Sequence, residues 1–340
     1  MPRGIMLVGS VPLADSAEVF DMVGERLGPL IARIPDGETG ERIHFIRFQD
    51  EVMTSTDWLE RRGDWMVAGK ASPLYGLKPG VSPDEVDFGP LGYAKAAIAS
   101  YEAFKASRAA GRVAPGTRFQ VSLPTPLTVL IKYASRESLL DLWPVYERAM
   151  FGEVDAILAA VPHADLAIQW DVAPEVHTVV EQPDTDVARI VSFEALTQAV
   201  GRAIDHIPAD VKTGCHLCYG DANHKHIIEP RDMGNLVRIA NGICAAAHRP
   251  VDWIHMPVPK DRDDDAYFAP MADLELKPET EVVLGLVHMT DGIEGARRRV
   301  AAAKAVRAEF GVATECGLGR RDPATIGPLL DLHRDIATTL

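Results

Sequence analysis

The sequence predicts an α/β protein that forms a single (β/α)8 TIM barrel over residues 1–340. Its length of 340 residues suits one large barrel. Hydrophobic residues make up 47% of the chain, which is enough for a sizeable core. Short apolar runs alternate with helical stretches from one end to the other, which is typical of parallel strands joined by helices.

Eight apolar runs are the predicted strands, and each is followed by sequence with helical character. In chain order they are Ile5–Val8, Leu30–Ile34, Arg118–Leu123, Leu166–Asp171, Val211–Cys218, Val251–Met256, Glu281–His288 and Gly311–Cys316. Eight strands of this kind favour the barrel. A doubly wound open sheet is the alternative, because it requires no particular number of strands.

Three helices are predicted from start signals and apolar spacing. The first begins after Ser192 and carries apolar residues at helical spacing up to Ile204. A second runs from about 292 to 309, with the arginines at 297–299 expected on its solvated side. The last begins with Asp322 as N-cap and Pro323 at the first helical position.

One connection is much longer than a barrel requires. More than 80 residues separate the second and third predicted strands. Within them, an insertion of about 45–112 contains Trp58 and Trp65, a turn-rich stretch at 72–90 and a helix around 93–110. We expect this insertion to act as a lid over the active site or as an oligomer contact, for example in a homodimer.

Composition limits the location and the partners. The net charge of −14 argues against nucleic acid and anionic membranes as partners. No apolar run is long enough to span a bilayer, and the sequence starts without a signal-peptide pattern. Four cysteines are too few for a disulfide scaffold and suit free thiols in a reducing compartment. We therefore expect a cytoplasmic protein that acts on a small molecule.

Polar residues collect where the predicted strands end, which is where barrel enzymes carry their active sites. From the first strand to the eighth they are Ser10; Asp36 and Glu38; Ser122; Asp171; His216 and Cys218; His255; His288 and Asp291; and Cys316. A purely structural barrel would not need this polar load.

His216 and Cys218 are the residues best suited to a metal. Positions two apart on a strand project to the same side, so the imidazole and the thiol would lie together. They form half of a zinc site, and Cys316 is the best candidate for a further ligand. A buried polar strand end is the structural alternative. A second cluster, His224 and His226, is more simply read as a solvated loop.

Four blocks of the sequence resemble the C-terminal catalytic barrel of cobalamin-independent methionine synthases, which transfer methyl groups to zinc-bound thiols. His216-Leu217-Cys218-Tyr219 is similar to the His-x-Cys zinc motif of that family, and Cys316-Gly317-Leu318 to its later cysteine block. Ile168-Gln169-Trp170-Asp171 resembles the segment whose acid holds the homocysteine amino group. Val8-Gly9-Ser10-Val11-Pro12 is similar to the family's opening turn.

The resemblance implies a zinc site of His216, Cys218, Cys316 and a fourth ligand on the sixth strand. The family has a glutamate there, and this chain has His255, which is also a competent zinc ligand. Val172 stands where the family has a second glutamate after the acid, so the substrate need not be an amino acid.

The predicted function is therefore that of a zinc-dependent methyl or alkyl transferase acting on a small thiol, with a donor such as methyltetrahydrofolate. Asp171, His288 and Asp291 are the expected catalytic residues, with His288 or Asp291 moving a proton. Ser10, Asp36, Glu38 and Ser122 would bind substrate, and Arg33, Arg42 and Arg47 could clamp a carboxylate or phosphate. Alternatives are a zinc-dependent lyase or hydrolase, a metal-free decarboxylase-like barrel and a non-enzymatic binding protein.

Overall fold

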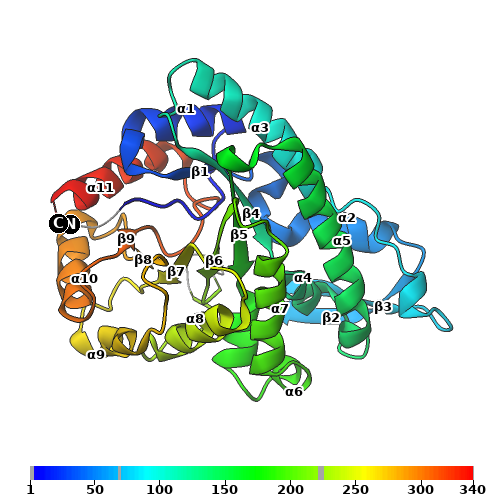
Figure 1. The fold of residues 1–340 in the computed structure, drawn as a ribbon. Coiled ribbons are helices and arrows are strands. Elements are labelled where there is room, and N and C mark those ends of the chain that lie inside the picture. The colour runs from blue at the N-terminus through cyan, green and yellow to red at the C-terminus, as the bar shows by residue number, and fades with distance from the viewer. Residues whose placement is uncertain (1–3, 68–69, 221–225, 340) are drawn as a thin grey trace.

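A curled sheet of seven parallel strands lies at the centre of the protein (Figure 1). The computed structural model describes residues 4–67, 70–220 and 226–339. In spatial order the strands are β1 (Arg33–Pro35), β4 (Arg118–Pro124), β5 (Leu166–Val172), β6 (Lys212–Leu217), β7 (Trp253–Pro257), β8 (Glu281–Gly285) and β9 (Gly311–Val312). Strands after β1 are neighbours in the order of the sequence, as the alternation with helices predicted.

Helices surround the outside of the sheet (Figure 1). They are α1 (Ser16–Leu27), α2 (Gln49–Ser55), α3 (Tyr93–Ala109), α4 (Pro126–Tyr133), α5 (Leu139–Ala160), α6 (Asp186–Ile190), α7 (Phe193–Asp205), α8 (Gly234–Ala246), α9 (Asp265–Phe268), α10 (Gly292–Val306) and α11 (Ile326–Thr339). The main core fills the space between these helices and the outward side chains of the strands, including Phe119, Ile168 and Ile254.

The first predicted strand is the one that does not form as a regular strand. Ile5 makes isolated parallel bridges to Ile31 and to Val312, which lie at opposite edges of the sheet. The Ile5 amide donates to the Leu30 carbonyl at 3.0 Å, and the Met6 amide donates to the Val312 carbonyl at 3.0 Å. The predicted run at 5–8 therefore lies between the two edges, and the regular part of the sheet has seven strands.

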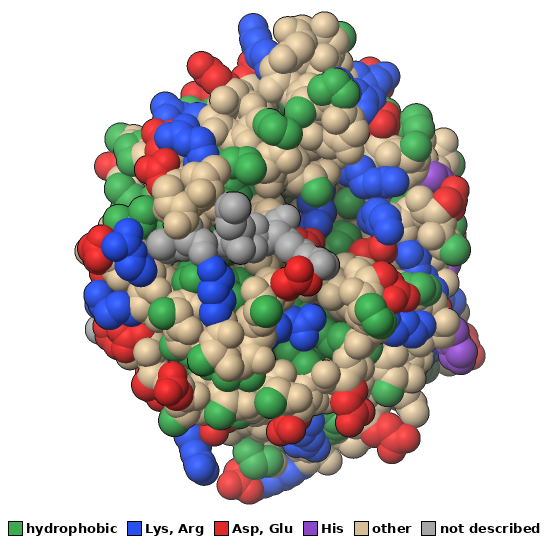
Figure 2. All heavy atoms as spheres, turned by 60° about the vertical axis from the view of Figure 1, so that its left-hand side comes forward, with side chains coloured by type: hydrophobic (Ala, Val, Ile, Leu, Met, Phe, Trp, Pro, Cys, Tyr) green, Lys and Arg blue, Asp and Glu red, His purple; other side chains and the backbone are tan. Residues whose placement is uncertain are grey.

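Charged side chains of both signs are interspersed on the face shown in Figure 2, without an extended area of one sign. Within residues 4–67, 70–220 and 226–339, none of the helices is long and apolar enough to cross a membrane.

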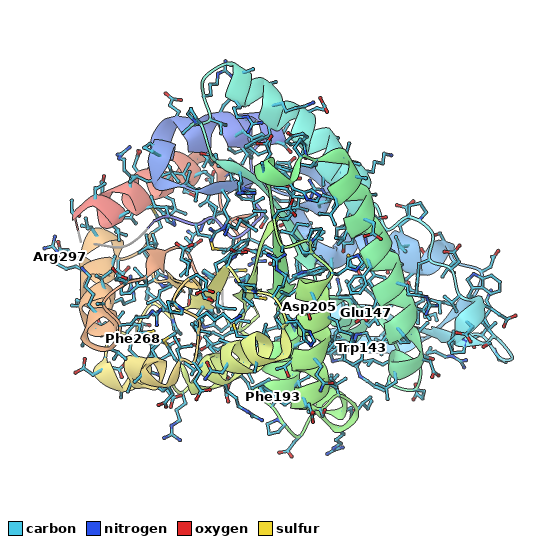
Figure 3. All side chains as sticks on the ribbon, viewed as in Figure 1. Trp143, Glu147, Phe193, Asp205, Phe268 and Arg297 are labelled. Carbon is cyan, nitrogen blue, oxygen red and sulfur yellow. The ribbon has the colours of Figure 1, made fainter. Side chains whose placement is uncertain are left out.

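The helix predictions hold with two exceptions. Ser192 caps α7, where its side chain accepts a hydrogen bond from the Ala195 amide. Arg297 points outward from α10 (Figure 3), but Arg299 is fully buried, so its expected place on the solvated side was wrong. Asp322 caps a short 3-10 turn, and α11 begins only at Ile326.

The long insertion folds into a 3-10 segment at Gly40–Phe48, α2, an antiparallel hairpin of β2 (Leu59–Val67) and β3 (Lys70–Leu77), and α3. The hairpin is attached beside α4, because the Ser135 amide donates to the Tyr75 carbonyl at 2.7 Å. The predicted helix at 93–110 is confirmed as α3.

The space enclosed by the curled sheet is tightly packed before the polar strand ends, where Trp253 of β7 lies against Gly214 of β6. A Cβ atom on Gly214 would lie 2.3 Å from the Trp253 ring and from its carbonyl oxygen. The Arg33 guanidinium covers the same ring at 3.9 Å and pairs with Glu281 at 3.3 Å. The indole thus fills the interior below the polar strand ends, and glycine makes the space for it.

We expect Gly214→Ala to reduce the free energy of unfolding by about 3 kcal/mol, because the added methyl group overpacks a rigid interior. Urea denaturation measures this change. Gly152→Ala is the matched control, since nothing lies within 4 Å of the added atom on α5. Alanine there should stabilise the helix by up to about 1 kcal/mol. Equal effects of the two substitutions would contradict the packing assignment.

Candidate metal and substrate site

Three polar side chains form a row at the carboxyl ends of adjacent strands. Asp171 of β5 is paired in register with His216 of β6, and His216 with His255 of β7. All three are buried. Because residues paired across parallel strands project to the same side, the sheet brings these groups together without help from loops. Cys215 and Leu217, which alternate with His216 along β6, face the opposite way, into the core.

Cys316 joins His216 and Cys218 from the loop after β9. Donor atoms of these three side chains lie within 4.8 Å of one another, and the two sulfur atoms are 3.9 Å apart. The loop is held by the Thr314 hydroxyl, which donates to the Cys316 carbonyl at 2.8 Å. Two thiols and an imidazole at such distances are a donor set that suits zinc.

The two thiols share one negative charge. The Cys218 thiol donates toward Cys316, and His216 and the Arg320 guanidinium, whose Nη2 lies 4.0 Å from Cys316 Sγ, add to its effect. These groups hold the pKa of Cys316 well below its ordinary value. The same hydrogen bond, together with burial, raises the pKa of Cys218. The lowered pKa favours the thiolate of Cys316, the form that binds metals.

His255 does not enter this group, although the resemblance implied that it is a ligand. Its Nδ1 lies 2.7 Å from His216 Nδ1, and its Nε2 lies 3.0 Å from the Thr314 carbonyl. Burial, with the nearby His216, holds the pKa of His255 well below its ordinary value, so the ring is neutral. Nε2–H must donate to the carbonyl, and Nδ1 then accepts from His216. This leaves His216 Nε2 as the unprotonated nitrogen.

Glu38 and Asp171 bring carboxyl groups to the same cavity as the thiols. Burial, together with the nearby Asp36 and Cys316, raises the pKa of Glu38 from 4.5 to about 8 against the effect of Arg42. Burial and Glu38 raise the pKa of Asp171, which accepts from Gln169 Nε2 at 2.7 Å. Neither carboxyl forms an ion pair among the described residues, so both are suited to a substrate group that donates hydrogen bonds or carries a positive charge.

Asp36 does not line the cavity but supports Glu38, which does. Its carboxylate pairs with Arg42 at 2.5 Å and accepts from Ser100 and from the Glu38 amide, each at 2.9 Å. These bonds hold Glu38 in a left-handed conformation with a φ of 46°. Asp36 therefore shapes the turn that presents Glu38.

Of the two serines predicted to bind substrate, one lines the cavity and the other does not. Ser10 lines the cavity, and its carbonyl and hydroxyl accept from the amides of Leu318 and Gly319 at 2.6 and 3.2 Å. Ser122 is buried below Gly9 and donates to the Val8 carbonyl at 2.9 Å. Only Ser10 can reach a molecule in the cavity.

His288 and Asp291 lie on the other side of the thiols. His288 lines a second cavity, of about 630 Å³, which shares Cys218 and Cys316 with the first. Its Nε2 donates to the Val258 carbonyl at 2.9 Å, and its Nδ1 lies 3.6 Å from Glu315. Asp291 is not in either cavity, because it pairs with the buried Arg299 at 2.7 Å.

Sequence reasoning missed Glu315 and His226. A strand continued to Cys316 would turn Glu315 away from the cavity, but β9 ends at Val312, so the alternation does not reach it. Glu315 faces the second cavity, 3.0 Å from His226. Although burial opposes it, Glu315 and Glu229 raise the pKa of His226 to about 9. His224, the other histidine of the second cluster, lies outside the described residues.

The first cavity measures about 550 Å³ and extends from the thiols to the insertion. Insertion residues on its wall include Arg47, Asp50, Trp65 and the segment 71–73. Lys132 and Tyr133 of α4 complete this side. Of the three arginines considered as a clamp, Arg33 pairs with Glu281 and Arg42 with Asp36, so only Arg47 lines the cavity.

We expect His255→Leu to weaken zinc binding by about 10- to 100-fold, because His216 loses the acceptor that orients it. His255→Gln should stay close to wild type, since its amide can accept from His216 and donate to the Thr314 carbonyl. Competition with a chelator measures both affinities. If His255 were itself a ligand, glutamine would lose zinc as leucine does.

Glu38→Gln should change the pH dependence of stability in the metal-free protein. The wild-type carboxyl keeps its proton in the folded state up to pH of about 8 but loses it near 4.5 when unfolded. Wild-type stability therefore falls as pH rises between these values. Glutamine does not titrate. The free energy of unfolding of the variant should therefore rise relative to that of wild type by about 4 kcal/mol from pH 5 to pH 8. Urea titrations at both pH values measure this, with the exposed Glu25→Gln as control. A difference that does not vary with pH would contradict it.

Comparison with models of known protein families gives no match, and comparison with curated proteins gives none. Among solved structures, the fold is similar to that of a Listeria monocytogenes protein with the provisional name vitamin-B12-independent methionine synthase, at a TM-score of 0.58. The two chains are 14% identical, and the match covers 98% of each. At this identity the likeness shows the fold alone: this chain shares the α/β architecture of a protein that bears that name.

Proposed function

We propose that this protein is a zinc-dependent transferase, similar to cobalamin-independent methionine synthases, that moves a methyl or other alkyl group to the thiol of a small molecule. The observation that carries the proposal is the group of His216, Cys218 and Cys316 on the wall of a cavity that also holds two buried carboxyls. The likeness in fold to the Listeria protein supports it.

The donor set fits a catalytic zinc site better than a structural one. Catalytic sites have three protein ligands and keep a position for substrate, whereas structural sites have four. With His255 engaged by His216 and Thr314, three ligands remain. A zinc ion held by them would bind the substrate thiol and lower its pKa, so that the thiolate is present at neutral pH.

The chain's own residues would orient the substrates and move the proton. Glu38 and Asp171 would hold a polar or amino group of the thiol substrate, close to Ser10. In the transfer a sulfur–carbon bond forms and the bond between the alkyl group and its donor breaks. The proton that the substrate thiol loses would pass to the leaving group. His288, in the second cavity beside Cys316, could relay it only through Nδ1, because its Nε2 donates to the Val258 carbonyl and burial lowers its pKa to about 4.

Two further parts of the proposal concern architecture. The bridges of Ile5 to both sheet edges support a (β/α)8 barrel closed by the segment at 4–8. The hairpin residues Trp65 and 71–73 on the cavity wall support a lid role for the insertion, because a cover there would exclude water from the reaction.

Metal content tests the site. Purified protein should hold about one zinc ion per chain, as a single set of ligands requires. Cys316→Ser should lose most of it and keep the fold, which circular dichroism checks. Cys244→Ser, a change on α8 away from the site, should keep all of it. Full zinc retention by Cys316→Ser would overturn the assignment.

Product analysis tests the reaction. The zinc-loaded protein, given a small thiol and methyltetrahydrofolate or another alkyl donor, should yield the alkylated thiol by mass spectrometry, and Cys316→Ser should not. Donor breakdown that does not depend on the thiol would indicate a lyase or hydrolase instead. Turnover that survives complete metal removal would indicate a metal-free decarboxylase-like enzyme.

A further inference from the structure

The first cavity joins the thiols at the strand ends to basic side chains on the wall that the insertion and α4 provide. Its buried end carries the thiols with Glu38 and Asp171. The wall on the side of the insertion carries two basic side chains, the exposed Arg47 and the half-buried Lys132, together with Asp50. A further cation, Arg320, lies next to Cys316. A molecule that extends from the thiols to the insertion would therefore reach Arg47 and Lys132.

The two cations are held side by side by the fold. The hydroxyl of Tyr133, next to Lys132 on α4, donates to the carbonyls of Ile46 and Arg47, each at 3.2 Å. Tyr133 is buried, so this contact ties the 3-10 segment of the insertion to the end of α4. The insertion thus brings Arg47 to a lysine that is distant in sequence.

Neither cation forms an ion pair within the part of the chain that the structure describes, and the Lys132 ammonium lies over the Tyr133 ring, 4.6 Å from its centroid. Among the described residues no carboxylate lies within ion-pair distance of Arg47 or Lys132. Asp50 is the acid on this wall, and its Oδ1 accepts from the Tyr75 hydroxyl at 3.1 Å. Burial and the neighbouring Arg47 lower the pKa of Lys132 to about 8, against a smaller effect of Asp50. Two neighbouring cations on a cavity wall, without a described ion-pair partner, are suited to bind an anion.

We propose that Arg47 and Lys132 form an anion subsite, which binds a carboxylate or similar anionic group at the far end of the substrate whose thiol reaches Cys218 and Cys316. This names the substrate class of the proposed transferase and rests on that function. The substrate is then a thiol with an anionic tail, oriented by charge along the cavity.

Cobalt-loaded protein tests the subsite, because a thiol that binds the metal changes its visible spectrum. Chain-matched pairs of mercaptocarboxylic acids and mercaptoalcohols, over a series of lengths, are titrated against it. At the best length the acid should bind about tenfold tighter than the alcohol, as expected for a charge-assisted hydrogen bond. Lys132→Met and Arg47→Met should each reduce this preference, and the double variant should abolish it.

The alcohols and one further variant are the controls. Alcohol affinity should be the same in every variant, which shows that the metal site is intact. Lys105→Met removes an exposed charge of α3 outside the cavity and should change nothing. Equal affinity of acid and alcohol at every length, or a preference that survives in the double variant, would overturn the subsite.

A metal-free measurement separates this proposal from the proposed function. If no thiol changes the cobalt spectrum, the transferase assignment fails, and the subsite is then judged on its own. Protein labelled with 13C-lysine is titrated with hexanoate and with hexanol. Hexanoate alone should shift the Lys132 resonance to saturation, and Arg47→Met should weaken the effect. No saturable shift would overturn the subsite.

Discussion

The parallel register of β5, β6 and β7 is the constraint on which the rest of the site depends. It places Asp171, His216 and His255 opposite one another at the carboxyl edge of the sheet. Neighbouring strands lie only about 4.8 Å apart, so buried polar groups in such a row contact one another. Each must find a partner there, because an unpaired polar group in the interior is costly.

The partners that these groups find determine their chemistry. His255 uses both ring nitrogens within the protein, and this leaves His216 Nε2 as the free donor atom. The two thiols lie close enough to share a proton, which concentrates negative charge on Cys316 near Arg320. Burial raises the pKa of both Glu38 and Asp171, which favours their protonated forms. One wall thus contains a negative sulfur beside neutral acids.

The insertion adds a wall of the opposite sign. It contributes Arg47 and the hairpin, and Tyr133 fixes this part against α4. A cavity with thiols at the strand ends and Arg47 and Lys132 on the wall beside the insertion is better suited to a polar thiol with an anionic tail than to an apolar ligand. The second cavity, with His288 and Glu315, gives access to the same sulfur atoms from the other side.

Local sequence was sufficient for the parallel α/β class, the strand that presents His216 and Cys218, and the helices at 193–205 and 93–109, because periodicity and caps are local properties. It also indicated Cys316 through a resemblance. It could not decide that His255 supports His216, that Asp291 pairs with a buried Arg299, or that Glu315 faces a cavity. Those outcomes depend on side chains from distant strands and loops competing for the same partners, and only the tertiary structure decides which pairs form.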